Sequence, residues 1–190
     1  MHSHRHAKNE ISTLDLFQQD RCEDHDTLCL LAFEHAQTLV EYVERDHLSM
    51  VHHRCPAYSL DRWNYGIEKR LEWPITSGSG WRGSYGDRVR GFIDLAIWYG
   101  LPTVRDDPDG GQPRKVVHAG RALLLVEVKT GRPNPIEWIR QVNFYKTFIT
   151  AEYAVFVPQK TGYEEVLRQN KITPIDASDA LGRKTERACS

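Results

Sequence analysis

The chain has 190 residues, of which 40% are hydrophobic and 27% are charged, a composition typical of one globular domain with a buried core. No stretch approaches the roughly 18 consecutive apolar residues that cross a bilayer, and residues 1–10 are polar, so we expect a cytoplasmic protein without a membrane partner. The formal net charge of -1 excludes a uniformly basic coat, but residues 1–50 hold ten acidic and only four basic side chains. The basic residues therefore gather later, where a local patch is enough to hold nucleic acid.

The N-terminal third is expected to consist of a polar extension, a helix and an irregular stretch. Residues 1–26 are polar throughout. From Thr27 to Asp46, apolar residues recur at helical spacing, which predicts a helix that covers one face of the fold. Residues 48–66 contain Cys55-Pro56 and Asn64-Tyr65-Gly66, and such turn-forming pairs favour irregular structure with at most a short strand.

The middle of the chain predicts strands. Three segments that are rich in Leu, Ile, Val and Trp and are bounded by Gly or Pro are Lys69–Ser77, Arg88–Tyr99 and Ala122–Thr130. The loops expected between them are Gly78–Asp87 and Gly100–Gly120. The second loop is rich in Asp and Gly, and its length favours a surface insertion.

The last third alternates between helix and strand. The predicted elements are a helix over Ile136–Ile149 that has Pro135 in its first turn, a strand over Tyr153–Val157, a helix over Tyr163–Asn170 and a strand over Ile172–Ile175. Residues 177–190 are polar and are expected to form a flexible tail. This order predicts a single α/β domain over residues 27–176, with a central mixed β-sheet flanked by helices.

Two opposite charges end the most apolar strand. Residues 122–128 are almost continuously apolar apart from Glu127, and Lys129 follows. Since side chains alternate along a strand, Glu127 and Lys129 share one face while Val128 points into the core. Buried charges are costly unless they are paired or bind something, and a metal ion together with a phosphate would satisfy both.

An acidic residue also interrupts the preceding strand. Asp94 stands between Phe92-Ile93 and Leu95-Ala96. Taken alone, Asp94 is better explained as a buried carboxylate that caps a turn or pairs with an arginine. Together with Glu127 and Lys129 on the next predicted strand, it indicates a catalytic cluster.

This cluster suits phosphodiester hydrolysis. The reaction needs a cation that neutralises charge in the transition state and lowers the pKa of the attacking water. Asp94, Glu127 and the backbone carbonyl of Val128 offer hard oxygen ligands, which favour Mg²⁺, with Mn²⁺ as a substitute. Lys129 would orient the water and balance the developing negative charge.

The arrangement resembles the signature of the PD-(D/E)XK, or restriction-endonuclease-like, nuclease superfamily. The likeness covers roughly Glu68 to Ile175 and rests on Gly91-Phe92-Ile93-Asp94, on Glu127-Val128-Lys129 and on the helix that bears Arg140-Gln141. It is similar to small phage and plasmid nucleases and to Holliday-junction-resolvase-like members. The resemblance implies a restriction-endonuclease-like core, cleavage of DNA as an endonuclease, and a supporting role for Gln141.

The sequence departs from the family pattern in two ways. The proline expected shortly before the first acid is absent, and 33 residues separate Asp94 from Glu127, which is more than in compact members. Many members also carry a glutamate further upstream, for which Glu72 is the first candidate and Glu68 the second. An ordinary exposed strand residue explains Glu72 about as well.

Several basic residues flank the predicted cluster. The candidates for DNA binding are Arg90, Arg132, Arg140 and Lys146. Side chains of this type position a duplex through its phosphates without reading its sequence. For each residue taken singly, a solvated surface charge is the preferred explanation. A homodimer would place two sites for double-strand or junction cleavage, and the sequence leaves the oligomeric state open.

Two other functions compete with an active nuclease. One is a catalytically silent DNA-binding module with a nuclease-like fold, since fold does not guarantee activity. The other is an unrelated α/β enzyme in which Lys129 acts as an amine nucleophile. A zinc site at His52, His53 and Cys55 or at His2, His4 and His6 is not favoured, because neither group has a second ligand cluster at zinc-site spacing.

Overall fold

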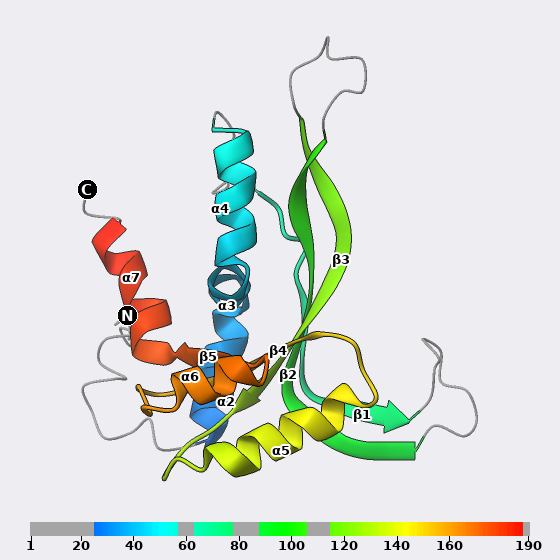
Figure 1. Cartoon of the computed structure of the whole chain (residues 1–190), viewed down its shortest axis with the longest axis vertical. Helices are drawn as coiled ribbons and strands as arrows, with labels where there is room; N and C mark the ends of the chain where they lie inside the picture. Colours follow the sequence, from blue (N-terminus) through cyan, green and yellow to red (C-terminus); the bar gives the residue numbers. More distant parts are fainter. Residues whose placement is uncertain (1–24, 57–62, 78–87, 106–114, 188–190) are drawn as a thin grey trace, which may run out of the picture.

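The computed structural model describes residues 25–56, 63–77, 88–105 and 115–187. These residues form a five-stranded sheet in the order β1-β2-β3-β4-β5, with helices on both of its faces (Figure 1). The pairs β1–β2 and β2–β3 are antiparallel, whereas β3, β4 and β5 run parallel to one another. The predicted α/β domain with a mixed sheet between helices is confirmed.

Three consecutive helices precede the sheet: α2 (His25–Glu34), α3 (Ala36–Val43) and α4 (Arg45–Arg54). The predicted single helix is therefore divided by turns at His35 and Glu44. The expectation of irregular structure from residue 48 is wrong as far as Arg54, because Leu48 and Val51 lie on one side of α4 and are buried.

The strands β1 (Glu68–Ser77), β2 (Arg88–Arg105) and β3 (Lys115–Val128) form a long antiparallel sheet. The predicted loop over Gly100–Gly120 is wrong, because β2 and β3 stay paired as far as Arg105 and Lys115 and project as a hairpin arm (Figure 1). The arm contains Thr103, Val104, Val116 and Val117, β-branched residues that favour strands. The Asp- and Gly-rich segment 106–114 lies outside the described residues.

The C-terminal half follows the predicted order as far as β5 and then continues into a helix. It comprises α5 (Pro135–Lys146), β4 (Glu152–Val157), α6 (Glu164–Gln169), β5 (Thr173–Asp176) and α7 (Ala177–Arg187). The crossover through α5 allows β4 to lie parallel to β3, as a helical connection usually does. The N-cap of α5 is Asn134, whose Oδ1 accepts a hydrogen bond from the backbone N–H of Glu137, and Pro135 stands in the first turn.

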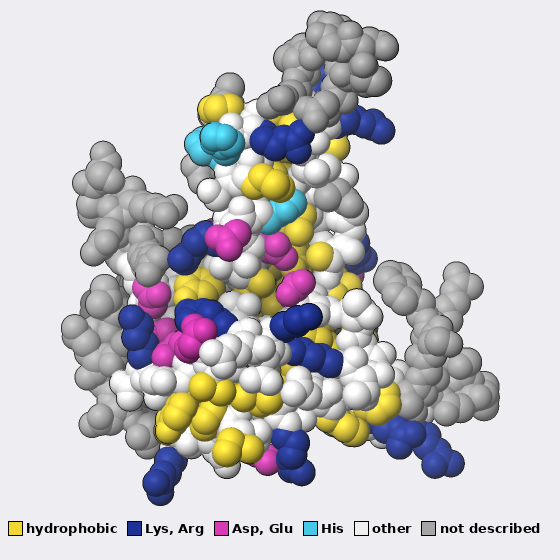
Figure 2. Space-filling view, viewed as in Figure 1, with side chains coloured by type: hydrophobic (Ala, Val, Ile, Leu, Met, Phe, Trp, Pro, Cys, Tyr) yellow, Lys and Arg dark blue, Asp and Glu magenta, His cyan; other side chains and the backbone are white. Residues whose placement is uncertain are grey.

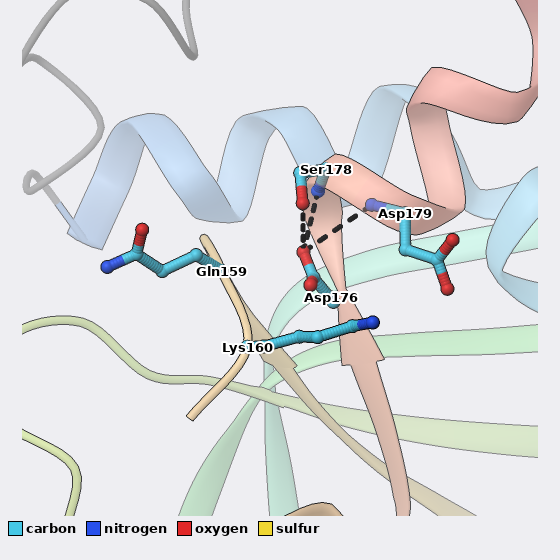
Figure 3. Close-up of a pocket in the computed structure, with 5 residues that line it drawn as sticks. All are labelled: Gln159, Lys160, Asp176, Ser178 and Asp179. Atoms are coloured by element: carbon cyan, nitrogen blue, oxygen red, sulfur yellow. Dashed lines mark hydrogen bonds between the residues drawn. The ribbon is translucent and has the colours of Figure 1, made fainter. Parts of the chain in front are cut away.

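A helix stands where a flexible tail was expected. Asp176 begins α7 by capping it: its Oδ1 accepts hydrogen bonds from the backbone N–H of Ser178 at 2.9 Å and from the Ser178 hydroxyl at 2.6 Å (Figure 3). The hollow beside this cap is also lined by Gln159 and Lys160. Ala177, Ala180 and Leu181 are buried against the core, and this packing orders a segment whose overall composition is polar.

The sheet separates two hydrophobic clusters. We call them the α2 cluster and the α5 cluster, after the helices that cover each face. The α2 cluster includes Leu28, Leu39, Leu95, Ile97, Val126, Val128, Phe156 and Leu181. The α5 cluster includes Ile75, Ile93, Ala96, Leu125, Trp138, Val142, Tyr145 and Leu167.

Among the residues described, none of the helices combines the length and the apolar character that a bilayer crossing needs.

Because α7 is packed, substitutions in it should change stability. We expect Leu181→Ala to lower the free energy of unfolding by about 2–3 kcal/mol, since a buried side chain is lost. Gly182→Ala should raise it by roughly 0.5–1 kcal/mol, because Gly182 is helical and a Cβ there meets open space. Urea denaturation of both variants checks this, and two unchanged transitions would mean that α7 does not pack in solution.

Candidate functional site

The strand β2 changes its alternation at Asp94. In a regular strand, residues two apart lie on the same face. Ile93, however, lies in the α5 cluster and Leu95 in the α2 cluster. A Cβ at Gly91 would also meet Tyr145 of α5, so the face changes between Ile93 and Leu95. Asp94 stands at this irregularity, between a residue of the α5 cluster and a residue of the α2 cluster.

The neighbouring strand β1 is irregular at the same level. The pairs Leu71 with Leu95 and Trp73 with Ile93 place Glu72 level with Asp94. Glu72 has a φ of 48°, a left-handed conformation that non-glycine residues seldom adopt. Figure 1 shows both strands bending sharply in this region, away from the direction of the long arm. Glu72, the first candidate for an upstream acid, is therefore an exposed residue at the bend.

Glu68, the second candidate for the upstream acid, lies away from this level. It is paired with Trp98 in the register, and its carboxylate forms a 2.5 Å ion pair with Arg121 of β3. These contacts belong to the pairing of the strands, and neither of them joins Glu68 to Asp94 or Glu127.

The strand β3 brings Glu127 beside Asp94. Asp94 raises the pKa of Glu127 both through a side-chain hydrogen bond and through its negative charge, so the two carboxyl groups lie close together. Asp94 Oδ2 also accepts a hydrogen bond from the backbone N–H of Val128 at 2.8 Å, which fixes its carboxylate against β3. The Val128 side chain is buried in the α2 cluster, whereas Glu127 and Lys129 extend toward α5. The two acids predicted on successive strands thus lie together.

The helix α5 completes a hydrogen-bonded triangle. Gln141 donates to Glu127 Oε1 at 2.7 Å and accepts from Lys129 Nζ at 2.9 Å. Lys129 Nζ also lies 3.1 Å from Glu127 Oε2. The Glu127 side chain is only 2% exposed and that of Lys129 is 20% exposed. Glu127, Lys129 and Gln141, all predicted from the sequence, are therefore in direct contact at a position that opens to solvent through Lys129.

Tyr145 is a member of this network that the sequence analysis missed. Its hydroxyl accepts from Gln141 Nε2 at 2.9 Å and donates to the backbone carbonyl of Phe92 at 3.0 Å. It therefore ties α5 to the strand that carries Asp94. The signal in the sequence is its spacing, since residues four apart on a helix lie on one face and Gln141 was already a candidate.

Burial and a neighbouring carboxylate change the protonation of Glu127. Burial raises its pKa from 4.5 to about 8, aided by the hydrogen bond and the negative charge of Asp94, while Lys129 acts in the opposite direction. With a pKa of about 8, Glu127 keeps its proton near neutral pH. A divalent cation would offset the same repulsion, as metal sites built from carboxylates do.

The helix α2 adds two further residues that the sequence analysis missed. His25 Nε2 lies 3.5 Å from Asp94 Oδ2, and Cys29 Sγ lies 3.7 Å from both nitrogens of the His25 ring. Burial, and then the charges of Asp94, Asp26, Glu127 and Glu72, raise the pKa of the Cys29 thiol to about 12. The i and i+4 spacing of a histidine and a cysteine was the available signal, but His25 precedes the predicted start of the helix.

The four basic candidates differ in how free they are to bind phosphate. Arg132 is exposed in the connection after β3, and Arg90 is exposed and lies over the ring of Phe148. Arg140 is exposed but bonds both Glu137 oxygens, at 2.7 and 3.0 Å. On the face of the molecule drawn in Figure 2, the Lys and Arg side chains stand in small separate groups, several of them beside acidic ones, and form no continuous patch.

Lys146, the fourth basic candidate, has a structural role. Its ammonium group donates to the backbone carbonyls of Asn170 at 2.7 Å and Lys171 at 3.1 Å, and thereby joins α5 to the end of α6. Burial lowers its pKa.

The zinc ligands considered from the sequence are not assembled where the structure describes them. His52 and His53 are exposed on α4, and His2, His4 and His6 lie outside the described residues. Within the described ranges, the one group of His, Cys, Asp and Glu side chains close enough for a shared cation is His25, Cys29 and Asp94.

Comparison of the chain with models of protein families, with curated proteins and with solved structures finds no match. An inference about function therefore depends on the geometry of the site and on the motif residues themselves.

The raised pKa of Glu127 predicts a particular dependence of stability on pH. Between pH 4.5 and about 8 the folded protein holds a proton that the unfolded chain releases, so in chelator the free energy of unfolding should fall as the pH rises and level off above pH 8. Glu127→Gln should flatten this part of the curve, while Glu165→Gln, an exposed control on α6, should not. Urea denaturation from pH 5 to 9 measures it; identical slopes in all three proteins would contradict the raised pKa.

Proposed function

We propose that the chain is a metal-dependent nuclease that hydrolyses phosphodiester bonds in DNA, with a restriction-endonuclease-like core. One observation carries the proposal. The carboxylates of Asp94 and Glu127 adjoin each other at a strand bend, and Lys129 and Gln141 are bonded to the second of them. A purely structural cluster does not need two acids in contact, because their repulsion opposes folding unless a proton or a cation is held between them.

The oxygen-rich part of the cluster fits a hard divalent cation. Asp94 and Glu127 would hold Mg²⁺ or Mn²⁺, and the Val128 carbonyl is the third ligand predicted from the sequence. Bound there, the cation would neutralise charge on the phosphoryl oxygens and lower the pKa of a coordinated water. The hydrogen bond from the Val128 N–H keeps Asp94 in place on the side facing Glu127.

Lys129 and Gln141 supply the remaining groups. The Lys129 ammonium group, 20% exposed, can donate to an attacking water and balance the negative charge of the transition state. Gln141 holds Lys129 and Glu127 at the same time, so it fixes the distance between the cationic group and the metal ligand. Tyr145 in turn fixes Gln141. These side chains would thus be oriented before substrate arrives, which lowers the cost of reaching the transition state.

The proposal is tested by cleavage of labelled linear, single-stranded, supercoiled and four-way-junction DNA. We expect cutting with Mg²⁺ or Mn²⁺ and none in chelator, and a loss of about 100-fold or more in Asp94→Asn and in Lys129→Ala. Glu165→Gln and Lys160→Ala are matched controls, because both residues are exposed and neither contacts the cluster.

Absence of metal-dependent cutting in the wild type, with DNA binding retained, would contradict an active nuclease and favour the silent DNA-binding module. Equal cutting by the wild type and Asp94→Asn would show that a contaminating nuclease produces the signal. Trapping of Lys129 by borohydride with a carbonyl compound would instead favour the amine-nucleophile enzyme.

The basic residues should differ in their contribution to DNA binding. In an Asp94→Asn background, Arg132→Ala should reduce the slope of log affinity against log salt by about 0.9, the value for one lost phosphate contact. Lys146→Ala should leave the slope unchanged and lower the free energy of unfolding by about 1–3 kcal/mol, because two carbonyls lose their donor. Fluorescence anisotropy across a salt series measures the slopes. A reduced slope for Lys146→Ala alone would reverse this assignment.

A further inference from the structure

The helix α2 places a nitrogen and a sulfur ligand beside Asp94. His25 and Cys29 are four residues apart, so they occupy the same side of the helix, one turn apart. Cys29 Sγ lies 3.7 Å from the ring nitrogens of His25, and His25 Nε2 lies 3.5 Å from Asp94 Oδ2. A nitrogen, a sulfur and an oxygen donor thus converge from two elements that are far apart in the sequence.

The spacing of these donors matches a tetrahedral metal site. With Zn–S near 2.3 Å and Zn–N near 2.0 Å, a tetrahedral ion separates sulfur from nitrogen by about 3.5 Å. The three ligand atoms of His25, Cys29 and Asp94 all lie within 4.8 Å of one another, so small side-chain rotations would bring them to that separation. Three protein ligands leave the fourth position to water or to a ligand.

The surroundings of His25 also suit a metal ligand. Its Nδ1 lies 3.4 Å from Asp26 Oδ1, whereas the contact with Asp94 is made by the other ring nitrogen, Nε2. A carboxylate that accepts the Nδ1–H fixes the tautomer in which Nε2 carries the free electron pair. Such carboxylate–histidine pairs are the usual support of metal-bound imidazole.

We propose that His25, Cys29 and Asp94 form a binding site for a thiophilic divalent cation such as Zn²⁺. Imidazole and thiolate select zinc-like ions over Mg²⁺, which prefers oxygen ligands. The site differs in ligand chemistry from the oxygen set of Asp94, Glu127 and Val128, yet it uses the same aspartate. One consequence rests on the proposed nuclease function: a zinc ion held by α2 withdraws Asp94 from the Mg²⁺ site and so inhibits cleavage.

Cobalt titration of the full-length protein tests the site without reference to activity. Co²⁺ bound by a thiolate absorbs in the near ultraviolet through sulfur-to-metal charge transfer, and tetrahedral Co²⁺ gives strong visible bands. We expect both absorptions in the wild type, their loss in Cys29→Ala, Cys29→Ser and His25→Ala, and their displacement by added Zn²⁺. Cys55→Ser is the matched control, because Cys55 is a described thiol at the end of α4 that belongs to no ligand group.

The outcomes separate clearly. A charge-transfer band that depends on both His25 and Cys29 supports the site; no band in the wild type, or one that persists without Cys29, overturns it. Two substitutions at Cys29, with unfolding curves measured for each, distinguish loss of a ligand from loss of the fold. Zn²⁺ should also raise the thermal midpoint of the wild type, and a rise of the same size in folded Cys29→Ala would overturn the site.

Inhibition tests the shared aspartate. The zinc concentration that halves each protein's own Mg²⁺-supported rate should rise at least about tenfold in Cys29→Ala and stay unchanged in Cys55→Ser. Equal inhibition of the wild type and Cys29→Ala would contradict the link. If neither the wild type nor any variant cleaves DNA but the cobalt bands depend on Cys29, the metal site stands and the nuclease proposal fails. If the wild type cleaves DNA but shows no such bands, the nuclease proposal stands and the metal site fails.

Discussion

The contact between the carboxylates of Asp94 and Glu127 is the constraint on which the rest of the site depends. Burial first, and then the hydrogen bond and the negative charge of Asp94, raise the pKa of Glu127 to about 8, because a charged Glu127 would have to stand beside a like charge with little water around it. The fold accommodates the pair through a bend at which β2 changes its alternation and Glu72 of β1 takes a left-handed conformation. Strain of this kind is typical of functional sites.

The groups around this pair reduce the free-energy cost of placing the two acids together and fix the orientation of their side chains. The Val128 N–H holds Asp94 against β3, and Lys129 and Gln141 hold Glu127 from the α5 side. Tyr145 then ties α5 to β2 itself. On the opposite face, α2 brings His25 to Asp94, so the two acids are approached from different layers: Asp94 from α2 and Glu127 from α5. A residue at a change of alternation can serve both faces, which explains how one aspartate belongs to an oxygen-rich set and to a softer set of ligands.

Most of the fold and the centre of the site could be predicted from the sequence. Hydrophobic periodicity indicates the strands, and a charged residue within an apolar strand is conspicuous because its burial needs an explanation. Asp94, Glu127 and Lys129 were identified in this way, Gln141 was implied by the family resemblance, and the four residues lie together. The arm of β2 and β3 was missed because Pro and Gly near its base outweighed its β-branched residues, and α7 was missed because tertiary packing orders a polar helix. His25 and Cys29 could not be placed, since nothing local indicates which face of a helix meets Asp94.

The most direct test of the account is the anomalous scattering of Mn²⁺ in crystals of the protein. The account predicts a peak between the Asp94 and Glu127 carboxylates and near the Val128 carbonyl, which disappears in crystals of Asp94→Asn. Crystals soaked in Mn²⁺ that show no peak at these carboxylates, or a peak there that persists in Asp94→Asn, would contradict the central claim that this pair of acids forms a cation site.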